Sequence, residues 1–208
     1  LGGKSPNIIF DDADLKKATV GALAGIFAGT GQSCIAGSRL LVQRKVYQEV
    51  TETLVQRARA IKLGNPVDPA TEMGTAANQP QFDRIMSSID GAVRSGAKLL
   101  TGGQAAKGPH LGRGFFIEPT IFGDVTNDMA VAQEEIFGPV LSIIPFDTEE
   151  VAIAIGNDTV YGLAAGIWTT NVSPAIAVSR EIRAATVSVN THPAAAAPLS
   201  TCCRTASS

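Results

Sequence analysis

The side chain best suited to covalent chemistry in this sequence is the thiol of Cys34. It lies in the small-residue segment GQSCIAGSR, residues 31–39, which follows a long helical pattern and precedes a strand-like run at 40–42. A thiol at the junction of two regular elements is held by the scaffold on both sides, yet a ligand can approach it closely, as a cysteine nucleophile requires. A single cysteine is more often a buried, unreactive side chain. Cys34 alone therefore leaves both interpretations open.

The composition indicates the class of protein that surrounds this thiol. The chain has 208 residues, of which 45% are hydrophobic and only 5% aromatic, so we expect a core of Ala, Val, Ile and Leu in one domain or two small ones. The 19 acidic and 17 basic residues are scattered and form no basic stripe, which argues against a nucleic-acid partner. No apolar run approaches the ~20 residues of a membrane span, and no secretory signal is visible. We therefore expect neither nucleic acid nor membrane as a partner.

The other candidates for metal or redox chemistry are few. Of the three cysteines one is isolated and two, Cys202 and Cys203, are adjacent, which is neither a disulfide framework nor a metal-ligand spacing. His110 lies in a glycine-rich loop and His192 follows the last predicted strand, and neither has a visible acidic partner. We expect no metal site, and a reducing, cytoplasmic compartment is the default expectation.

Helical and strand patterns alternate along the chain. Acidic residues at 11, 12 and 14 suit a helix start, and apolar residues at helical spacing predict a helix of four or five turns over residues 12–28, which Gly29 and Gly31 end. Further helices are predicted at 46–61, 82–93, 148–155 and 173–182. Strands are predicted at 8–10, 39–43, 98–100, 115–117, 120–122, 140–145, 166–169 and 185–189. This alternation predicts a layered α/β domain with a largely parallel sheet flanked by helices.

The composition changes near the end of the chain. Residues 193–208 are mainly Ala, Ser, Pro and Cys, with Arg204 as the single charge and no periodicity. We therefore predict one domain over residues 1–192 and a disordered or foreign tail over 193–208.

Several stretches together resemble the catalytic half of the aldehyde dehydrogenase superfamily of NAD(P)-dependent enzymes. The resemblance covers roughly residues 1–190, and it rests on the order and spacing of six motifs: LGGKSPNIIF-DDAD, FAGTGQSCIAGSR, KLGNPVDP, GRGFFIEPTIF, QEEIFGPVLSI and YGLAAGIWT. One of these motifs alone would be weak, whereas their combination is specific. The resemblance implies the same layered α/β fold that the periodicity predicts.

In that family the cysteine of the second motif is the nucleophile, and Cys34 is the matching residue. The resemblance implies that its thiolate adds to an aldehyde to give a thiohemiacetal, whose oxyanion accepts a hydrogen bond from the cysteine's own backbone N–H. Hydride then leaves for the nicotinamide, and water hydrolyses the thioester. Ser33 and Ile35 resemble positions that line the substrate tunnel, although side chains there often only pack.

The resemblance also implies cofactor contacts. Glu135 matches the residue that accepts hydrogen bonds from the nicotinamide ribose, which suits a carboxylate facing two adjacent hydroxyls, and Phe137 matches the ring beside the nicotinamide. Gln81 and Arg84 fall where the family makes weaker ribose contacts, or else they are exposed polar side chains of a helix. Whether the cofactor is NAD or NADP cannot be read from these residues.

The sequence departs from the family at both ends. The general-base glutamate would precede Leu1, and the dinucleotide-binding domain, an asparagine of the oxyanion hole and the oligomerisation strand have no counterpart. We therefore expect a fragment of a homo-oligomeric enzyme, with exposed apolar surface, that is inactive by itself and whose Cys34 is open to alkylation. Two alternatives stay open: an inactive fragment that serves as an interaction module, and a cysteine-dependent esterase.

Overall fold

One seven-stranded sheet organises the molecule, for which the computed structural model describes residues 2–108, 111–112 and 114–191. The strands lie in the order β3-β4-β5-β2-β1-β6-β7, and every neighbouring pair is parallel except β3 and β4. The prediction of a largely parallel sheet is therefore confirmed. The strands are β1 (Pro6–Ile9), β2 (Arg39–Gln43), β3 (Lys98–Thr101), β4 (Thr120–Gly123), β5 (Val140–Phe146), β6 (Ala164–Trp168) and β7 (Thr186–Val189).

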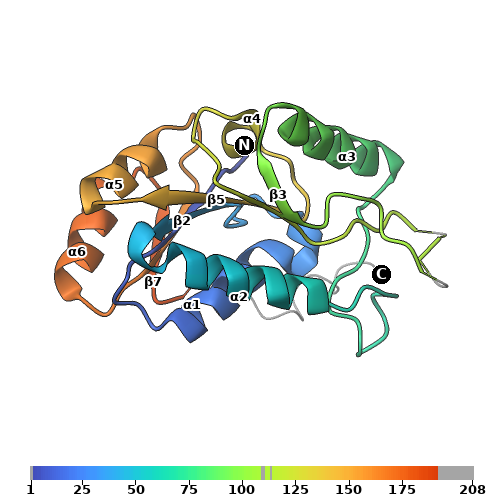
Figure 1. Cartoon of the computed structure of the whole chain (residues 1–208), viewed down its shortest axis with the longest axis horizontal. Helices are drawn as coiled ribbons and strands as arrows, with labels where there is room; N and C mark the ends of the chain where they lie inside the picture. Colours follow the sequence, from blue (N-terminus) through green and yellow to red (C-terminus); the bar gives the residue numbers. More distant parts are fainter. Residues whose placement is uncertain (1, 109–110, 113, 192–208) are drawn as a thin grey trace, which may run out of the picture.

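Helices cover both faces of this sheet, so the domain has three layers (Figure 1). One face carries α1 (Leu15–Phe27) and α2 (Tyr47–Ala60), which pack against each other and on the sheet. The opposite face carries α3 (Gln79–Arg94), α4 (Ala130–Gln133), α5 (Glu149–Asn157) and α6 (Val172–Glu181). Two short 3-10 turns, η1 (Ala28–Gly31) and η2 (Arg44–Val46), join helices and strands.

The core follows from the alternation of side chains along the strands. Ile9 and Leu40 pack with α1 and α2, whereas their neighbours Ile8 and Leu41 pack with α5 and α6 on the other face. Since successive side chains of a strand point to opposite faces, a strand covered on both sides is mainly apolar. β1 and β6 are buried throughout and apolar except at Asn7, whose Oδ1 accepts from Trp168 Nε1 at 2.8 Å.

Two predicted elements differ from the structure. The first helix begins at Leu15 rather than at residue 12, because the Asp14 side chain caps it by accepting from the Lys17 N–H at 3.1 Å. With 13 residues it makes fewer than four turns. The strand predicted at 115–117 is wrong: Ile117 makes only a single bridge, with Ala105. Pro119 lacks an N–H, so it cannot extend a ladder there.

The remaining predicted helices and strands are present, with ends displaced by a few residues, and the four-residue helix α4 was not predicted. The tail 193–208, with Cys202 and Cys203, and both histidines lie outside the described residues. In the described part of the chain no helix is long and apolar enough to cross a membrane. The same part contains no cluster of three side chains that could hold a metal ion.

Candidate active site

The candidate active site forms where the amino ends of neighbouring strands meet. β5, β2, β1 and β6 are adjacent and parallel, so the segments that precede them all lie at the amino-terminal end of the strands. Glu135 precedes β5, Cys34 precedes β2, Gly3 precedes β1 and Tyr161 precedes β6. Residues far apart in the sequence are thereby brought together, and most of the predicted site residues are among them.

Cys34 occupies the tip of a tight turn. The Ala36 N–H donates to the Ser33 carbonyl at 3.1 Å, and the thiol within this turn is exposed. Ser33 and Ile35 flank it and are half-buried. Among the described residues no acceptor is found for the Cys34 backbone N–H, so this donor is available to a bound oxygen.

Three residues in the left-handed backbone conformation redirect the chain from the end of α1 into this loop. Gly29, Thr30 and Gly31 have φ values of 60°, 61° and 67°, a region that costs a β-branched residue such as Thr30 appreciable strain. At Gly31 a side chain is also excluded by space, because a Cβ there would lie 2.1 Å from the Gly138 carbonyl oxygen. This close approach joins the cysteine loop to the segment that carries Glu135 and Phe137.

Gly3 makes the second junction between these loops. A Cβ on Gly3 would lie 1.8 Å from the carbonyl oxygen of Cys34, so the two backbones are in direct contact. The Gly3 N–H donates to Oε1 of Glu135 at 2.8 Å. The other carboxylate oxygen, Oε2, faces Gly2 and accepts no hydrogen bond from the described residues. Glu135 is thus oriented by one oxygen and keeps the other free.

Phe137 and Gln81 form the part of the site that adjoins Glu135. The Phe137 ring is 39% exposed on a backbone with φ of 56°, which is unusual for an aromatic residue. Gln81 donates its side-chain amide to the carbonyls of Phe137 at 2.8 Å and Ile136 at 3.1 Å. Its amide nitrogen therefore holds the Phe137 loop. Arg84 is exposed one turn further along α3, and in the described part of the chain its guanidinium has no hydrogen-bond partner.

A small cavity of about 10 Å³ marks where these groups converge, room for roughly one water molecule. Its lining includes Gly3, Ser33, Glu135 and Phe137. The structure therefore brings Ser33, Glu135 and Phe137 together around this cavity. Cys34 does not line it, but it follows Ser33 and its carbonyl contacts Gly3. Gln81 holds the Phe137 loop, and Arg84 is exposed on α3.

Two residues at the site were missed by sequence reasoning. Gln32 donates to the Thr75 carbonyl at 3.1 Å and accepts from the Ala77 N–H at 2.8 Å, so it ties the cysteine loop to the segment that precedes α3. The Tyr161 ring packs beside Gly2, next to the free oxygen of Glu135. Only the position of Gln32 two residues before Cys34 could have drawn attention to it.

Two basic side chains, Arg39 and Lys4, are buried next to these loops. Arg39 donates to the Lys4 carbonyl, to Asn127 Oδ1 and to the carbonyls of Ile155 and Gly156, each at 2.9 Å. Burial lowers the pKa of Arg39 to about 10. Lys4 is 1% exposed, and in the described structure its Nζ has no hydrogen-bond partner. Burial, with the charge of Arg39, lowers the pKa of Lys4 to about 7, although Glu135 and Glu134 act in the opposite direction.

An apolar groove runs along α1. It has a volume of about 450 Å³ and ends at Ala28 and Gly29, where the chain turns toward Cys34. Its lining comes from α1, α2 and the segments after them: Val20, Leu23, Ala24, Phe27, Arg57, Ala60, Ile61 and Glu72. Val20 is 47% exposed. The groove was not predicted, and the apolar residues on the outer side of α1 were its only signal.

The sequence and the fold both match known aldehyde dehydrogenases. An aldehyde dehydrogenase of Emericella nidulans is 50% identical over 192 residues, which are 92% of this chain and 38% of that protein. A betaine aldehyde dehydrogenase of Brucella anthropi is 46% identical over the same share of the chain. A crystal structure of a point mutant of betaine aldehyde dehydrogenase from Staphylococcus aureus, in complex with NAD+ and with a BME-modified cysteine, has a TM-score of 0.92. It is 40% identical and covers 93% of this chain, which spans 39% of it.

The chain thus spans well under half the length of these relatives. The model of the aldehyde dehydrogenase family matches residues 1–201, which include every part of the site described above. The chain belongs to the aldehyde dehydrogenase family.

Proposed function

We propose that this chain supplies the nucleophile and one wall of the cofactor site of an NAD(P)-dependent aldehyde dehydrogenase, with Cys34 as the nucleophile. The observation that carries the proposal is the position of Cys34 relative to Glu135. Cys34 is exposed, its backbone N–H has no acceptor among the described residues, and its carbonyl contacts Gly3, whose N–H donates to Glu135. Family membership supports the class of reaction.

Each step of the proposed reaction uses groups of the chain. The Cys34 thiolate adds to the aldehyde carbon, and the Cys34 N–H donates to the oxygen on which negative charge develops. Loss of hydride from this carbon leaves a thioester on Cys34. Water then releases the carboxylic acid and regenerates the thiol. The tight turn and the contact with Gly3 hold the thiol and its N–H in one geometry, which limits the reorganisation needed for attack.

The residues present fit a nicotinamide cofactor. Oε2 of Glu135 accepts no hydrogen bond within the described structure and can accept from ribose hydroxyls, while Oε1 stays on Gly3. The exposed Phe137 ring offers an apolar face for the nicotinamide, and Gln81 holds the backbone that carries it. When bound, the cofactor accepts the hydride. Arg84, Ser33 and Ile35 are proposed as outer contacts to the cofactor and the substrate.

The apolar groove along α1 is the proposed path for the aldehyde. Its lining includes Ala28 and Gly29, which precede the cysteine loop in the sequence, and is mainly aliphatic, with Phe27 as the one aromatic ring. Such a lining favours aldehydes with an apolar portion. Arg57 and Glu72 at its border are the charged groups a polar substrate would meet.

The test uses a longer polypeptide in which this chain is completed to the length of its relatives. NAD(P)H formation with short aldehydes should be lost by about 10⁴-fold or more in Cys34→Ala. Glu135→Gln should raise the KM for the cofactor more than it lowers kcat. Ser87→Ala, an exposed change on α3, is the matched control and should leave both constants unaltered. Full activity in Cys34→Ala would refute the proposal.

A cysteine-dependent esterase is the alternative that the exposed thiol and its free N–H also permit. Hydrolysis of an activated ester without any nucleotide, abolished in Cys34→Ala, would favour it. A folded, completed protein that acts on neither aldehyde nor ester would favour an interaction module.

A further inference from the structure

Glu135 is held by a hydrogen bond through only one of its two carboxylate oxygens. The Gly3 N–H donates to Oε1 at 2.8 Å, whereas Oε2 accepts no hydrogen bond from the described residues. The terminal torsion of a glutamate side chain has no sharply preferred value, so this single hydrogen bond does not fix the direction of Oε2. The orientation of the carboxylate therefore has a further cause.

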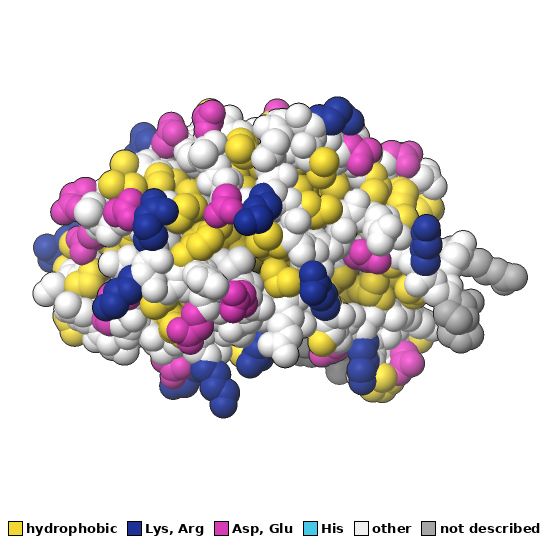
Figure 2. Space-filling model, viewed as in Figure 1, with side chains coloured by type: hydrophobic (Ala, Val, Ile, Leu, Met, Phe, Trp, Pro, Cys, Tyr) yellow, Lys and Arg dark blue, Asp and Glu magenta, His cyan; other side chains and the backbone are white. Residues whose placement is uncertain are grey.

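Electrostatic attraction does not supply this cause. Acidic and basic side chains are mixed over the face of the molecule in Figure 2, and the formal net charge is only -2, so the chain has no strong field of one sign. The buried Lys4 attracts Glu135, but its Nζ forms no hydrogen bond with any described residue. Such an attraction acts on the carboxylate as a whole and does not select one of its oxygens.

Space beside Gly2 is the constraint that remains, and the Tyr161 ring limits it. A Cβ on Gly2 would lie 2.6 Å from Oε2 of Glu135 and 3.1 Å from Cε1 of Tyr161. The carboxylate and the edge of the ring therefore border the same small space. Non-bonded heavy atoms pack best at roughly 3.5–4.0 Å, so Oε2 has no room to turn toward Gly2. The edge of an aromatic ring is also the positive part of its quadrupole, which favours a neighbouring carboxylate oxygen.

The loop that carries Tyr161 is itself fixed. The Tyr161 N–H donates to Thr159 Oγ1 at 3.3 Å, and the Gly162 carbonyl accepts from the Ala185 N–H at 2.9 Å. A Cβ on Gly162 would lie 3.0 Å from the Arg183 carbonyl oxygen, so this loop lies close against the segment that precedes β7. The ring is thus anchored by backbone contacts at its own residue and at the next one.

A polar network joins the loop before β6 to the segment before β5. Gln133, at the end of α4, donates to the Asn127 carbonyl at 2.6 Å and to the Asp158 carbonyl at 3.0 Å. Asn127 Nδ2 donates to the same Asp158 carbonyl at 2.9 Å and to Asp158 Oδ2 at 2.8 Å. The buried Arg39 in turn donates to Asn127 Oδ1 at 2.9 Å. The two segments are therefore held at a fixed separation.

We propose that Tyr161 is a positioning residue of the cofactor site: its ring, packed beside Gly2, keeps Oε2 of Glu135 available to the ribose hydroxyls of the cofactor. The ring acts by packing. The Tyr161 hydroxyl forms no hydrogen bond with the described residues and is not required. The inference rests on the proposed function, in which Glu135 contacts the ribose. Every contact that supports it lies among the described residues, so the remainder of a longer protein would not remove it.

The Gly3 amide reports the orientation of Glu135 in the chain itself, without a cofactor. Tyr161→Leu should speed hydrogen exchange of this amide by about tenfold, measured by NMR, because the carboxylate that accepts from it becomes mobile. The amides of β2 serve as the internal reference, since a general loss of stability would speed their exchange too. Tyr161→Phe keeps the ring and should exchange at the parent rate. Tyr161→Met, a second variant without a ring, should behave like Tyr161→Leu.

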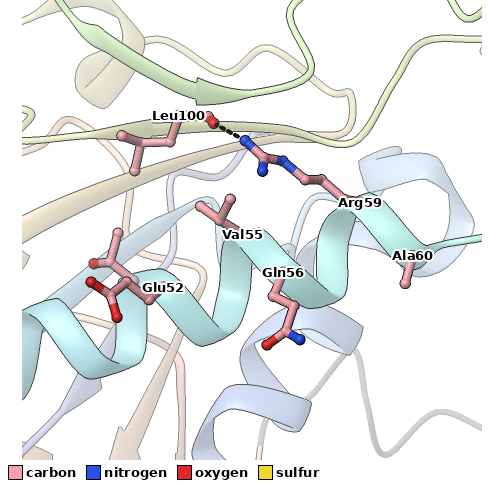
Figure 3. A pocket seen from close by; sticks show the side chains of 7 residues that line it. Glu52, Val55, Gln56, Arg59, Ala60 and Leu100 are labelled. Atoms are coloured by element: carbon pink, nitrogen blue, oxygen red, sulfur yellow. Dashed lines mark hydrogen bonds between the residues drawn. The ribbon is translucent and has the colours of Figure 1, made fainter.

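Two controls alter half-buried side chains elsewhere in the chain. Tyr47→Leu makes the same substitution at the chain's other tyrosine, whose hydroxyl accepts from the Asp124 N–H beyond the carboxyl end of β4. Val55→Ala shortens a side chain of α2 that points toward Leu100 (Figure 3). Neither side chain belongs to the candidate active site, so both variants should leave exchange at Gly3 unchanged relative to the β2 amides.

The kinetic test uses the polypeptide completed to the length of its relatives. Tyr161→Leu should raise the KM for the cofactor by about tenfold with little change in kcat, and Tyr161→Phe should keep the parent values. In a Glu135→Gln background Tyr161→Leu should raise the KM no further, because both changes remove the same contact.

The exchange and kinetic results distinguish a failure of the Tyr161 assignment from a failure of the proposed function. Exchange at Gly3 that stays at the parent rate in Tyr161→Leu would overturn the role of Tyr161 alone. So would a Tyr161→Phe variant as impaired as Tyr161→Leu, or a KM that rises equally in the Glu135→Gln background. A KM that is unaffected by Glu135→Gln would refute the proposed cofactor site, and the role of Tyr161 with it.

Discussion

The backbone of Gly3 lies against the carbonyl oxygen of Cys34, so close that a Cβ on Gly3 would be 1.8 Å from that oxygen. This contact joins the residue that precedes β1 to the thiol that precedes β2, and through the Gly3 N–H it also reaches Glu135. The lack of space, and not the backbone conformation, requires a glycine here, because Gly3 does not have a positive φ. The geometry of the candidate site therefore depends on a residue that carries no functional group.

Gly3→Ala should destabilise the chain and displace the cysteine loop. The added methyl has no room against backbone atoms, and such overpacking costs about 1–3 kcal/mol. Urea unfolding should show a lower midpoint with an unchanged m-value. Gly91→Ala on α3 is the control, because its Cβ would meet only the tip of Arg94 at 3.9 Å. A Gly3→Ala chain as stable as the parent would mean that the close contact is absent in solution.

Gln32→Met should loosen the cysteine loop without unfolding the domain. Methionine keeps the length of the side chain but loses the hydrogen bonds to Thr75 and Ala77. Each is worth about 1 kcal/mol, so amides of the Cys34 peptide should exchange at least roughly tenfold faster in hydrogen-exchange mass spectrometry. Gln48→Met removes only a hydrogen bond to Glu52 on the surface of α2 and should leave that peptide unaffected. Equal exchange in both variants would count against a clamp by Gln32.

Acid should weaken the structure at the carboxyl ends of β1 and β6 through Asp12. Its carboxylate accepts hydrogen bonds from the hydroxyls of Thr169 and Thr170 and from the N–H groups of Thr170 and Asn171, at 2.8–3.0 Å. Burial raises the pKa of Asp12, but these hydrogen bonds together hold it below its usual value. Because the folded pKa is the lower one, this stabilisation is present above about pH 4 and is lost as the pH falls further.

The check is a series of thermal melts from pH 7 to pH 3. Asp12→Asn should lower the Tm at pH 7. The difference in Tm between this variant and the parent chain should shrink as the pH falls and Asp12 of the parent chain becomes protonated. Asp90→Asn, an exposed change on α3, is the control. A gap that stays constant over the whole range would show that the carboxylate charge does not matter.

Much of the fold could be predicted from the sequence, because the periodicity of apolar residues reports local structure. The start of α1 could not, since Asp12 is committed to a partner 157 residues away and leaves the cap to Asp14. That Cys34 and Glu135 belong to one site was predicted only from the resemblance, because local sequence patterns do not reveal the order of the strands in the sheet. The backbone of Phe137 and the amide of Gln81 that holds it depend on contacts between distant loops. Those contacts become visible only when the strands are placed side by side.

Lys4→Met should remove a pH dependence on the alkaline side. The folded pKa of Lys4 is about 7 and its usual value is 10.5, so the unfolded chain binds the extra proton between these values. Stability should therefore rise with pH from about 7 toward 10.5, with a slope of at most about 1.4 kcal/mol per pH unit. Urea titrations at pH 7, 8 and 9 should show this rise in the parent chain and a flatter profile in Lys4→Met. Parallel profiles would mean that Lys4 finds a partner or water in solution.

The chain by itself should react at Cys34 yet bind no NAD+ at micromolar concentration. Alkylation needs only an accessible thiol, and Cys34 is exposed at the tip of its turn. Cofactor binding needs more than Glu135 and Phe137, which form one wall around a cavity of about 10 Å³. Positioning of both reactants accounts for roughly 7–11 kcal/mol in well-oriented systems, and one wall cannot provide it.

Iodoacetamide labelling with peptide mapping, beside calorimetric titration with NAD+, measures both properties on one sample. Cys34→Ser is the control for labelling. Since no binding of NAD+ is expected for the parent chain, Glu135→Gln should give the same calorimetric titration. Micromolar binding of NAD+ would contradict the prediction, because it would mean that this chain contains enough of the cofactor site to bind NAD+ by itself. A Cys34 that resists alkylation under native conditions and reacts only after unfolding would mean that the turn closes over its thiol in solution.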